Sequence, residues 1–357
     1  MNFDFADVLM EVLEQKASDL HLMAGAPPMV RVRGHLAPLD YPVLTPQDVR
    51  ETVYSIITND QRQKLETDWQ IDFAYAIPGK ARFRVNAYFQ RAAIGAAMRL
   101  IPQDMPSLDD LGVPAVLREF TKKPRGLVLV TGPTGSGKST TLAAMIDLIN
   151  AERHEHIMTI EDPIEFLHKH KSCIVNQREL GADAKGFGVA LKAALRQDPD
   201  VILVGEMRDL ETIGTALTAA ETGHLVFATL HTQDTAQTVD RIVDVFPPEQ
   251  QHQVRVQLSV GLQGIVTQQL LPTADGKGRI VACEVLVPTP AVRNLIREGK
   301  THQIYSVLQT GAQHGMQTMD AALAQLVRDG KISRELAESR SSTPEELRRL
   351  MGTVRVA

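Results

Sequence analysis

A glycine-rich segment near the middle of the chain constrains its fold more than any other feature. It reads Gly132-Pro-Thr-Gly-Ser-Gly-Lys-Ser139, with an apolar run at Gly126–Thr131 before it and a helical pattern at Thr140–Ile149 after it. A strand, a glycine-rich loop and a helix in this order are typical of a phosphate-binding loop, in which backbone N–H groups and the helix N-terminus face the phosphates. We therefore expect the chain to bind a nucleoside triphosphate.

The residues of this loop have separate roles in phosphate binding. The glycines let the backbone wrap closely around a phosphate. Lys138 would reach the β- and γ-phosphates, and the Ser139 hydroxyl would bind Mg²⁺. The positions predicted to contact the nucleotide form one continuous stretch: Gly132, Pro133, Thr134, Gly135, Ser136, Gly137, Lys138, Ser139 and Thr140.

Length and composition limit the other possibilities. A chain of 357 residues is too long for one typical core and suits two domains. A formal net charge of -5 argues against an unselective nucleic-acid binder, which needs a basic surface, although it leaves room for a local basic patch. The two cysteines, Cys173 and Cys283, lack the spacing of a metal site or a disulfide framework.

The sequence gives no sign of a membrane segment. The start of the chain, Met1–Asp7, is acidic where a signal peptide would be positive. No apolar run approaches the roughly 20 residues that cross a bilayer. We therefore expect a cytoplasmic protein with no direct membrane insertion, whose contact with a membrane would come through a partner.

Residues 1–101 are expected to form a smaller N-terminal α+β domain. Helical patterns cover Phe3–Gln15 and Pro46–Leu65. Alternating apolar runs predict a mixed antiparallel sheet with strands at Ser18–Leu22, Met29–Arg33, Ile71–Ala76, Arg82–Gln90 and Ala93–Ile101. Pro102 and Pro106 interrupt any helix or central strand, so residues 102–106 are the predicted linker.

From residue 107 the pattern changes to an alternation of strands and helices. The predicted strands are short apolar runs: Leu127–Val130, His156–Ile160, Val201–Val204 and Leu225–Thr229. This alternation predicts an α/β domain over residues 107–280, with a parallel sheet covered by helices on both faces. After about Ile280 the chain is expected to be mainly helical, so residues 281–357 form a predicted C-terminal region.

Acidic side chains follow two of these strands. The segment Thr159–Glu165 places Glu161 and Asp162 at a strand end. Because the carboxyl ends of parallel strands converge on the ligand crevice, these carboxylates would face Mg²⁺ or the attacking water; the alternative is an exposed acidic turn.

The second acidic strand end is Asp200–Glu206, which finishes in Gly-Glu where most such strands finish in Asp-Glu. Glu206 is the first candidate for holding the metal or polarising water, and an ion pair at the strand end is the alternative. A third strand, within Thr222–His231, ends in a histidine. His231 would sense the γ-phosphate through a hydrogen bond, although a lone histidine at a strand end is more often structural.

The first domain carries a stretch rich in basic residues. No acidic residue occurs between Phe73 and Gln103, and the basic residues there are Lys80, Arg82, Arg84, Arg91 and Arg99. Arginines on strands without acidic partners predict a positive surface for an anion. A nucleotide on a neighbouring subunit is one candidate; a solvated strand face and contact with nucleic acid are the alternatives.

Taken together, these segments resemble the secretion ATPase superfamily, and within it the PilT family of type IV pilus retraction motors, along essentially the whole chain. Ala17–Leu22 is similar to the family's N-terminal signature, and Gly132–Ser139 to its nucleotide loop. Its Asp box, atypical Walker B and His box are matched in order by Thr159–Glu165, Asp200–Glu206 and Thr222–His231. Ala291–Glu298 differs from the family's retraction helix only by Val292 in place of Ile.

The resemblance implies a fold and an activity. The fold is a RecA-like P-loop ATPase domain with a smaller, PAS-like N-terminal domain and a helical C-terminal region that holds the retraction helix. The activity is ATP hydrolysis with Mg²⁺ by a homohexamer that drives pilus retraction and twitching motility. Glu206, together with Glu161, would position water, and Arg84 and Arg99 would complete the site across the subunit boundary.

The resemblance also implies partners and leaves alternatives. The partners are an inner-membrane pilus platform protein and a paralogous retraction ATPase, at the cytoplasmic base of the pilus machine. Accessory PilU motors share most of the motifs, and the helix at Ala291 favours PilT. A nucleic-acid translocating ring and an ATP-binding regulator without activity are the rivals from other classes.

Overall fold

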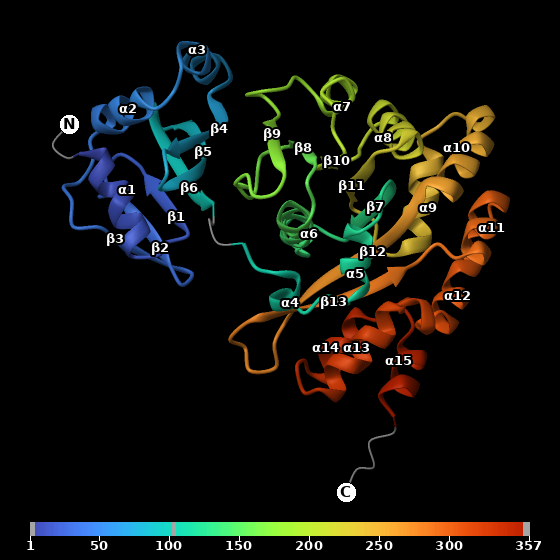
Figure 1. Ribbon diagram of the computed structural model, residues 1–357. Helices are drawn as coiled ribbons and strands as arrows, with labels where there is room; N and C mark the ends of the chain where they lie inside the picture. The colour runs from blue at the N-terminus through green and yellow to red at the C-terminus, as the bar shows by residue number, and fades with distance from the viewer. Residues whose placement is uncertain (1–3, 102–104, 353–357) are drawn as a thin grey trace, which may run out of the picture. The chain divides into compact units, whose positions relative to one another are not determined.

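The computed structural model describes residues 4–101 and 105–352. Two compact units make up the chain, Met1–Asp104 and Met105–Ala357, and each has its own sheet and hydrophobic core (Figure 1). Part of the predicted linker, residues 102–104, lies outside the described residues. None of the described helices combines the length and the apolar character that a membrane span needs.

The first unit is a six-stranded antiparallel sheet with helices. The strand order is β3-β2-β1-β6-β5-β4. Its helices are α1 (Phe5–Glu14), α2 (Pro46–Ser55) and α3 (Asn59–Asp68), and its strands are β1 (Asp19–Leu22), β2 (Met29–Val32), β3 (His35–Pro38), β4 (Gln70–Ile77), β5 (Ala81–Gln90) and β6 (Ala93–Ile101). Of these elements β3 was not predicted, because its residues are mostly exposed and show no apolar alternation.

Local sequence explains why these elements begin where they do. Thr45 and Thr58 start α2 and α3 with capping boxes, in which the threonine side chain and a side chain three residues later satisfy each other's backbone N–H groups. Along β5 the side chains alternate, so that Phe83 and Val85 enter the core while Arg84 is exposed on the other face of the sheet.

The second unit is built on a seven-stranded sheet with the order β13-β12-β7-β11-β10-β8-β9. Its strands are β7 (Gly126–Thr131), β8 (His156–Glu161), β9 (Ile174–Glu179), β10 (Val201–Val204), β11 (Leu225–Leu230), β12 (Leu262–Pro272) and β13 (Arg279–Leu286). All neighbouring pairs are parallel except β12 and β13. Every residue of β7, β10 and β11 is buried, as expected for strands covered on both faces.

Helices cover both faces of this sheet, as predicted. Leu127 and Leu129 of β7 belong to one apolar cluster, and Val128 and Val130 to the other. The first cluster includes side chains of α7 (Phe187–Ala194), α8 (Leu210–Thr222), α9 (Thr235–Asp244), α10 (Pro248–Gly261), α11 (Pro290–Glu298) and α12 (Ile304–Thr310). The second includes those of α4 (Leu108–Leu111), α5 (Val116–Thr121) and α6 (Lys138–Glu152).

The expectation that the chain is mainly helical after about Ile280 needs a correction. Residues Arg279–Leu286 form β13, so the line drawn between residues 280 and 281 falls inside a strand of the sheet. The strands β12 and β13 are joined by a tight turn, in which Thr273 N–H donates to Gly278 O (3.0 Å) and Gly276 has φ +67°. The Asp275-Gly276 pair was a turn signal that could have revealed this hairpin.

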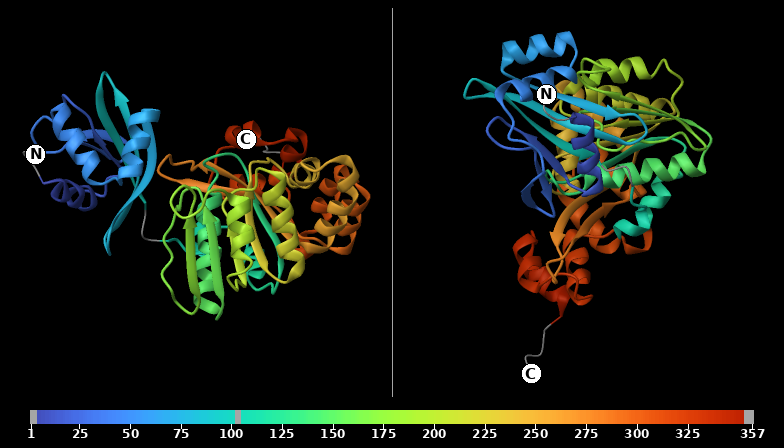
Figure 2. Two further views of the ribbon diagram at one scale, coloured as in Figure 1. Left: turned by 90° about the horizontal axis from the view of Figure 1, so that it is seen from above. Right: turned by 90° about the vertical axis from the view of Figure 1, so that its left-hand side faces the viewer.

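The remaining helices pack at one end of the second unit. Figure 2 shows the red helices α13 (Met319–Arg328), α14 (Arg334–Arg340) and α15 (Pro344–Met351) beyond the orange β12–β13 hairpin. Leu323 and Leu347 form a small core there with Leu271 and Ala282 of the hairpin. This helical region is therefore attached to the sheet through the hairpin.

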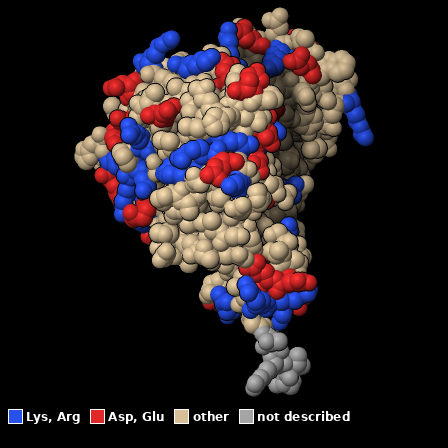
Figure 3. Space-filling view, turned by 90° about the vertical axis from the view of Figure 1, so that its right-hand side faces the viewer, with Lys and Arg blue, Asp and Glu red and all other residues tan. Residues whose placement is uncertain are grey.

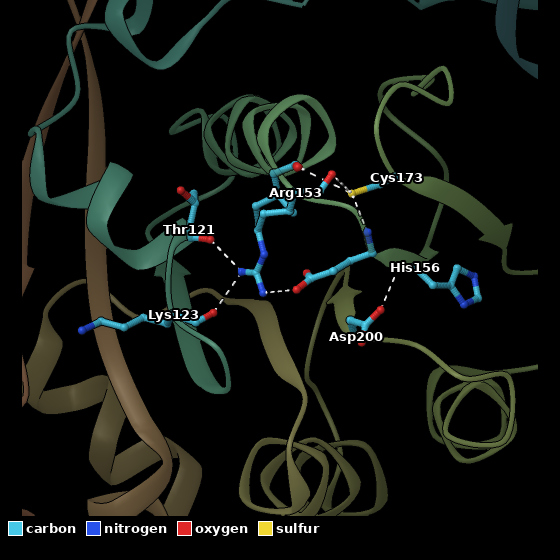
Figure 4. A network of polar contacts seen from close by, with 8 residues as sticks. Thr121, Lys123, Arg153, His156, Cys173 and Asp200 are labelled. Atoms are coloured by element: carbon cyan, nitrogen blue, oxygen red, sulfur yellow. Dashed lines mark hydrogen bonds and ion pairs between the residues drawn. The ribbon is translucent and has the colours of Figure 1, made fainter.

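A polar network fixes the edge of the sheet where β8 and β10 begin (Figure 4). Arg153, just after α6, donates to the carbonyl oxygens of Thr121 (2.9 Å) and Lys123 (3.0 Å) and pairs with Glu155. Asp200, just before β10, accepts the His156 N–H at the start of β8 (2.9 Å). The candidate functional residues lie at the opposite edge of the sheet, at the carboxyl ends of the parallel strands.

Gly264→Ala is expected to destabilise the second unit. At Gly264, where the pairing of β12 with β7 shifts register, an added Cβ would lie 2.4–2.7 Å from ring carbons of Phe120. We expect the free energy of unfolding to fall by about 1–3 kcal/mol, as for other overpacked cores, in urea titrations followed by circular dichroism. Gly278→Ala is the control, because the nearest atom there is 3.7 Å away. Equal stability of the two variants would contradict this packing.

Candidate functional site

The glycine-rich loop leaves β7 in a conformation that only glycine adopts easily. Gly132, Gly135 and Gly137 have φ values of +134°, +80° and +90°. At Gly132 an added Cβ would lie 2.3 Å from Gln268 O, so the backbone approaches β12 too closely for any side chain. Gly137 caps α6 without a side-chain hydrogen bond, and the first N–H groups of the helix are left for an anion.

Two polar side chains of the loop are poised for a ligand. The Lys138 ammonium is buried and donates to Gly132 O (2.8 Å) and Pro133 O (3.0 Å). Burial lowers the pKa of Lys138, and the negative charge of Glu206 acts in the opposite direction. The hydroxyl oxygen of Ser136 is buried and has no hydrogen-bond partner in the described part of the chain. Both groups would gain partners from a phosphate.

A cavity of about 320 Å³ adjoins the loop. Leu111 of α4, Thr140 of α6 and Leu270 of β12 line it, together with Arg279 and Val281 of β13. All of these elements belong to the second unit. The lining also includes Asp110, Ser136 and Thr141, so apolar, hydroxyl and charged groups of both signs surround a space suited to a small organic ligand.

Glu206 follows β10 and is held by the side chains of Arg208 and His231. Its carboxylate oxygens lie 2.6 Å from Nε and 2.6 Å from Nη2 of Arg208, and His231 Nε2 lies 3.1 Å from Oε1. Burial raises the pKa of Glu206, but the hydrogen bond and charge of Arg208 and the charge of His231 outweigh it, so the net pKa is lowered. The ion pair that was the alternative interpretation of Glu206 is therefore present, and the group is ionised at neutral pH.

The unusual Gly-Glu ending of this strand has a steric cause. An added Cβ at Gly205 would lie 3.1 Å from Ile160 O and 3.2 Å from Glu161 Cα on the neighbouring strand β8. The Gly205 carbonyl in turn accepts the Thr229 hydroxyl of β11 (2.5 Å). The aspartate found in most such strands would require the backbone of β8 to shift by a few tenths of an ångström, so this position favours glycine.

Glu161 ends β8 in an environment opposite to that of Glu206. It is 8% exposed, and its Oε1 accepts the Thr159 hydroxyl (2.6 Å) and the Gln177 amide (3.1 Å). Burial raises the pKa of Glu161, and the hydrogen bonds from Thr159 and Gln177 offset part of that rise. A carboxylate with neutral donors and a raised pKa is suited to accept a proton. Asp162 is exposed.

The structure brings most of the predicted site residues to one edge of the sheet. The loop from Gly132 follows β7, and Glu161, Glu206 and His231 stand at the ends of β8, β10 and β11. Asp209, three residues after Glu206, caps α8 by accepting the Thr212 N–H (2.8 Å). The sequence did not predict the ion pair of Arg208 with Glu206 or the hydrogen bond of Gln177 to Glu161, because neither Arg208 nor Gln177 belongs to a strand-end motif.

The predicted arginines lie on the outer face of the first unit's sheet. Arg84 of β5 and Arg99 of β6 are directly opposite each other in the register, and Arg99 is opposite Asp19 of β1. Arg99 Nε donates to Asp19 Oδ1 (2.9 Å), which corrects the expectation that these arginines lack acidic partners. The partner comes from another part of the sequence. Arg84 is exposed and has no ion-pair partner among the residues described.

Comparison with known proteins identifies the family. The sequence profile described as "Type II/IV secretion system protein" matches residues 3–277. The chain belongs to this family. It is 53% identical to the type IV pilus retraction ATPase PilT of Pseudomonas aeruginosa over 96% of this chain and 99% of the relative. It is 43% identical to the type IV pilus ATPase PilU of the same organism, over 97% of this chain and 90% of the relative.

A solved structure gives the same result for the fold. The crystal structure of the pilus retraction motor PilT with bound ADP superposes with a TM-score of 0.91 at 52% identity, covering 97% of this chain and 99% of that chain. The predicted fold class is confirmed: a RecA-like P-loop ATPase domain with a smaller, PAS-like N-terminal domain and a helical C-terminal region.

Gly205→Asp, which restores the more common strand ending, is expected to lower stability. The new side chain would push β10 away from Ile160 and Glu161, and such overpacking costs about 1–3 kcal/mol. Differential scanning calorimetry against Gly278→Asp, at a glycine whose Cβ position has no atom nearer than 3.7 Å, would measure this. A Gly205 variant as stable as the Gly278 variant would refute the steric account.

Proposed function

We propose that this chain is a motor ATPase that hydrolyses ATP and thereby drives retraction of type IV pili. The observation that carries the proposal is the meeting of the Gly132–Thr140 loop with Glu206 at one edge of a RecA-like sheet, close enough for the charge of Glu206 to act on Lys138. The likeness to PilT over nearly the whole chain supports pilus retraction as the work that this hydrolysis drives.

The residues present fit ATP with Mg²⁺. The loop supplies positive-φ glycines, free helix N–H groups and the unpartnered Ser136 hydroxyl, which together suit a phosphate chain. Ser139 and Glu206 offer the hard oxygen ligands that Mg²⁺ takes alongside phosphates. In residues 4–101 and 105–352 no group of three or more His, Cys, Asp or Glu side chains is arranged to hold a metal ion. Bound Mg²⁺ would neutralise charge on the phosphates.

The cavity beside the loop is the proposed site of the adenosine part. It adjoins Gly137 and Thr140 and is lined by apolar side chains of β12 and β13. Leu270 and Val281 would contact the faces of a planar base, and the Arg279 guanidinium would stack on it or bond to the ribose.

The two strand-end carboxylates would share the handling of water. Glu206 stays ionised, and Arg208 and His231 fix its orientation. When the nucleotide binds, the Glu206 carboxylate would give up part of its bonding to Arg208 and bond to the reacting groups instead. Glu161 retains a higher affinity for protons, which suits it to accept one from water as the γ-phosphate leaves.

We propose that the working form is a homohexamer with shared sites. Arg84 and Arg99 would supply positive charge to the nucleotide of a neighbouring subunit and stabilise the transition state. Of the two, Arg84 is free to do so, whereas Arg99 would first exchange Asp19 for a phosphate oxygen.

The proposed retraction helix is tied to the nucleotide-binding sheet. Val292 and Ile296 of α11 are buried, and Arg293 donates to Val260 O (2.7 Å) and Leu262 O (3.0 Å), where α10 ends and β12 begins. Because β12 pairs with β7, a shift of the glycine-rich loop would reach α11 through two packed elements. The proposed partner is a pilus platform protein at the inner membrane, with a paralogous retraction ATPase as a second.

The alternatives have weaker support. A PilU-type accessory role is opposed by the lower identity to PilU, 43% against 53% to PilT, and by the sequence of α11.

Figure 3, which shows the face with α10 and α11, has basic and acidic side chains intermixed along a band with uncharged surface beside it. A nucleic-acid motor needs a more uniform basic surface, and hydrolysis unaffected by added DNA would exclude it.

Glu206→Gln is expected to retain ATP binding and lose turnover. The substitution keeps the shape of the side chain but removes the charge that orients water and metal, so kcat should fall by about a hundredfold or more. Steady-state phosphate release, with binding measured by a fluorescent nucleotide, would test this. Equal turnover in the two proteins would exclude Glu206 from the chemical step and leave the handling of water to Glu161 alone, and no turnover in either would favour the regulator or an accessory motor that needs its partner.

A mixture of two inactive variants is expected to regain activity if sites are shared between subunits. Arg84→Ala lacks the proposed trans-acting charge and Lys138→Ala lacks the phosphate ligand, so mixed rings contain some complete sites. Arg50→Ala, on the exposed face of α2 in the same unit, should behave as wild type. An active monomer in gel filtration, or no recovery after mixing, would reject the shared site.

A further inference from the structure

Gln177 of β9 contacts three groups around Glu161 with a single side chain. Its Nε2 donates to Glu161 Oε1 (3.1 Å) and to Phe166 O (2.8 Å), and its Oε1 accepts the His168 N–H (2.8 Å). Phe166 and His168 belong to the segment of residues 162–172 that follows Glu161 and leads towards β9. One amide therefore joins the carboxylate to two points of the backbone that comes after it.

The sheet register explains why this residue reaches Glu161. Gln177 is directly opposite Thr159 across the parallel β8–β9 pair. The Thr159 hydroxyl donates to the same carboxylate oxygen, Oε1, at 2.6 Å. Two donors from adjacent strands thus fix Oε1, whereas Oε2 accepts a long bond from the Glu165 N–H (3.5 Å). Oε2 keeps the greater capacity to accept a bond from water.

The chemistry at this position favours an amide over a charged side chain. A lysine or arginine beside Glu161 would lower its basicity, as Arg208 does for Glu206. A second carboxylate would repel it. The half-buried His168 adds no positive charge, because desolvation lowers its pKa to about 4 and the ring is neutral at physiological pH. Glutamine supplies one donor for the carboxylate, a second for Phe166 O, and an acceptor for the backbone.

We propose that Gln177 is a positioning residue for ATP hydrolysis, which holds Glu161 by Oε1, leaves Oε2 for the attacking water, and couples the carboxylate to residues 162–172. The inference rests on the proposed function, because the orientation of Glu161 matters to turnover only if this site activates water. The nucleotide itself is bound elsewhere, by the loop from Gly132.

The test compares Gln177→Leu and Gln177→Glu with wild type in the full chain, by steady-state phosphate release. Both variants should lower kcat by about tenfold to a hundredfold and leave KM for ATP within about twofold, because they misplace a reacting group without touching the nucleotide. Gln177→Glu keeps the size of the side chain but replaces the donor to Glu161 by a second carboxylate, so it remains informative if the leucine variant folds poorly. Asn176→Asp is the matched control on the exposed side of the same strand.

A double-mutant cycle separates positioning from mere structural support. In a Glu161→Gln background, Gln177→Leu should have little further effect on kcat, because the group it positions is already lost. The exchange of the His168 amide hydrogen should also become faster in Gln177→Leu. Additive losses in the cycle, or wild-type kcat in both Gln177 variants, would overturn the positioning role alone. A wild-type chain that releases no phosphate would instead reject the proposed function and, with it, this role.

Discussion

The burial of parallel strands on both faces is the constraint on which the rest of this protein depends. Strands β8, β10, β11 and β7 pair in parallel at the centre of the second sheet, so their carboxyl ends lie along one edge. The glycine-rich loop, Glu161, Glu206 and His231 each follow one of these ends. Polar groups that are far apart in the sequence meet there because the apolar strands can be buried only in this arrangement.

Close packing at this edge also sets the chemistry of each carboxylate. Gly205 lets β10 approach β8, and the residue after it emerges between Arg208 and His231. Glu161 remains buried, and its carboxyl oxygens accept hydrogen bonds from neutral donors, namely the Thr159 hydroxyl, the Gln177 amide and the Glu165 N–H. Two glutamates on neighbouring strands thus acquire opposite pKa shifts, which is the division of labour that general acid–base chemistry needs.

Elements with a regular apolar period were predictable and those without one were not. The strands β7, β8, β10 and β11 and the helix α1 were found, because burial imposes an unbroken apolar run on the strands and a helical period on α1. Strand β9 was missed since Asn176 and Gln177 interrupt its pattern, and β12 since Gln263, Gln268 and Gln269 interrupt its own. Strand β13 was missed because it was assigned to a helical region. The polar residues of β9 serve contacts with other strands and the following loop, which a local pattern cannot show.

The sequence by itself determined the nucleotide loop, the alternation of strands and helices, and the strand-end candidates Glu161, Glu206 and His231, since these depend on local chain geometry and short-range pattern. Only the tertiary structure decided how those groups are paired. Arg99 meets Asp19 across 80 residues, and Gln177 meets Glu161 across 16, through sheet register. Hydrogen bonds act over a few ångströms in space regardless of separation along the chain, so their partners, and the pKa shifts that follow, exist only after folding.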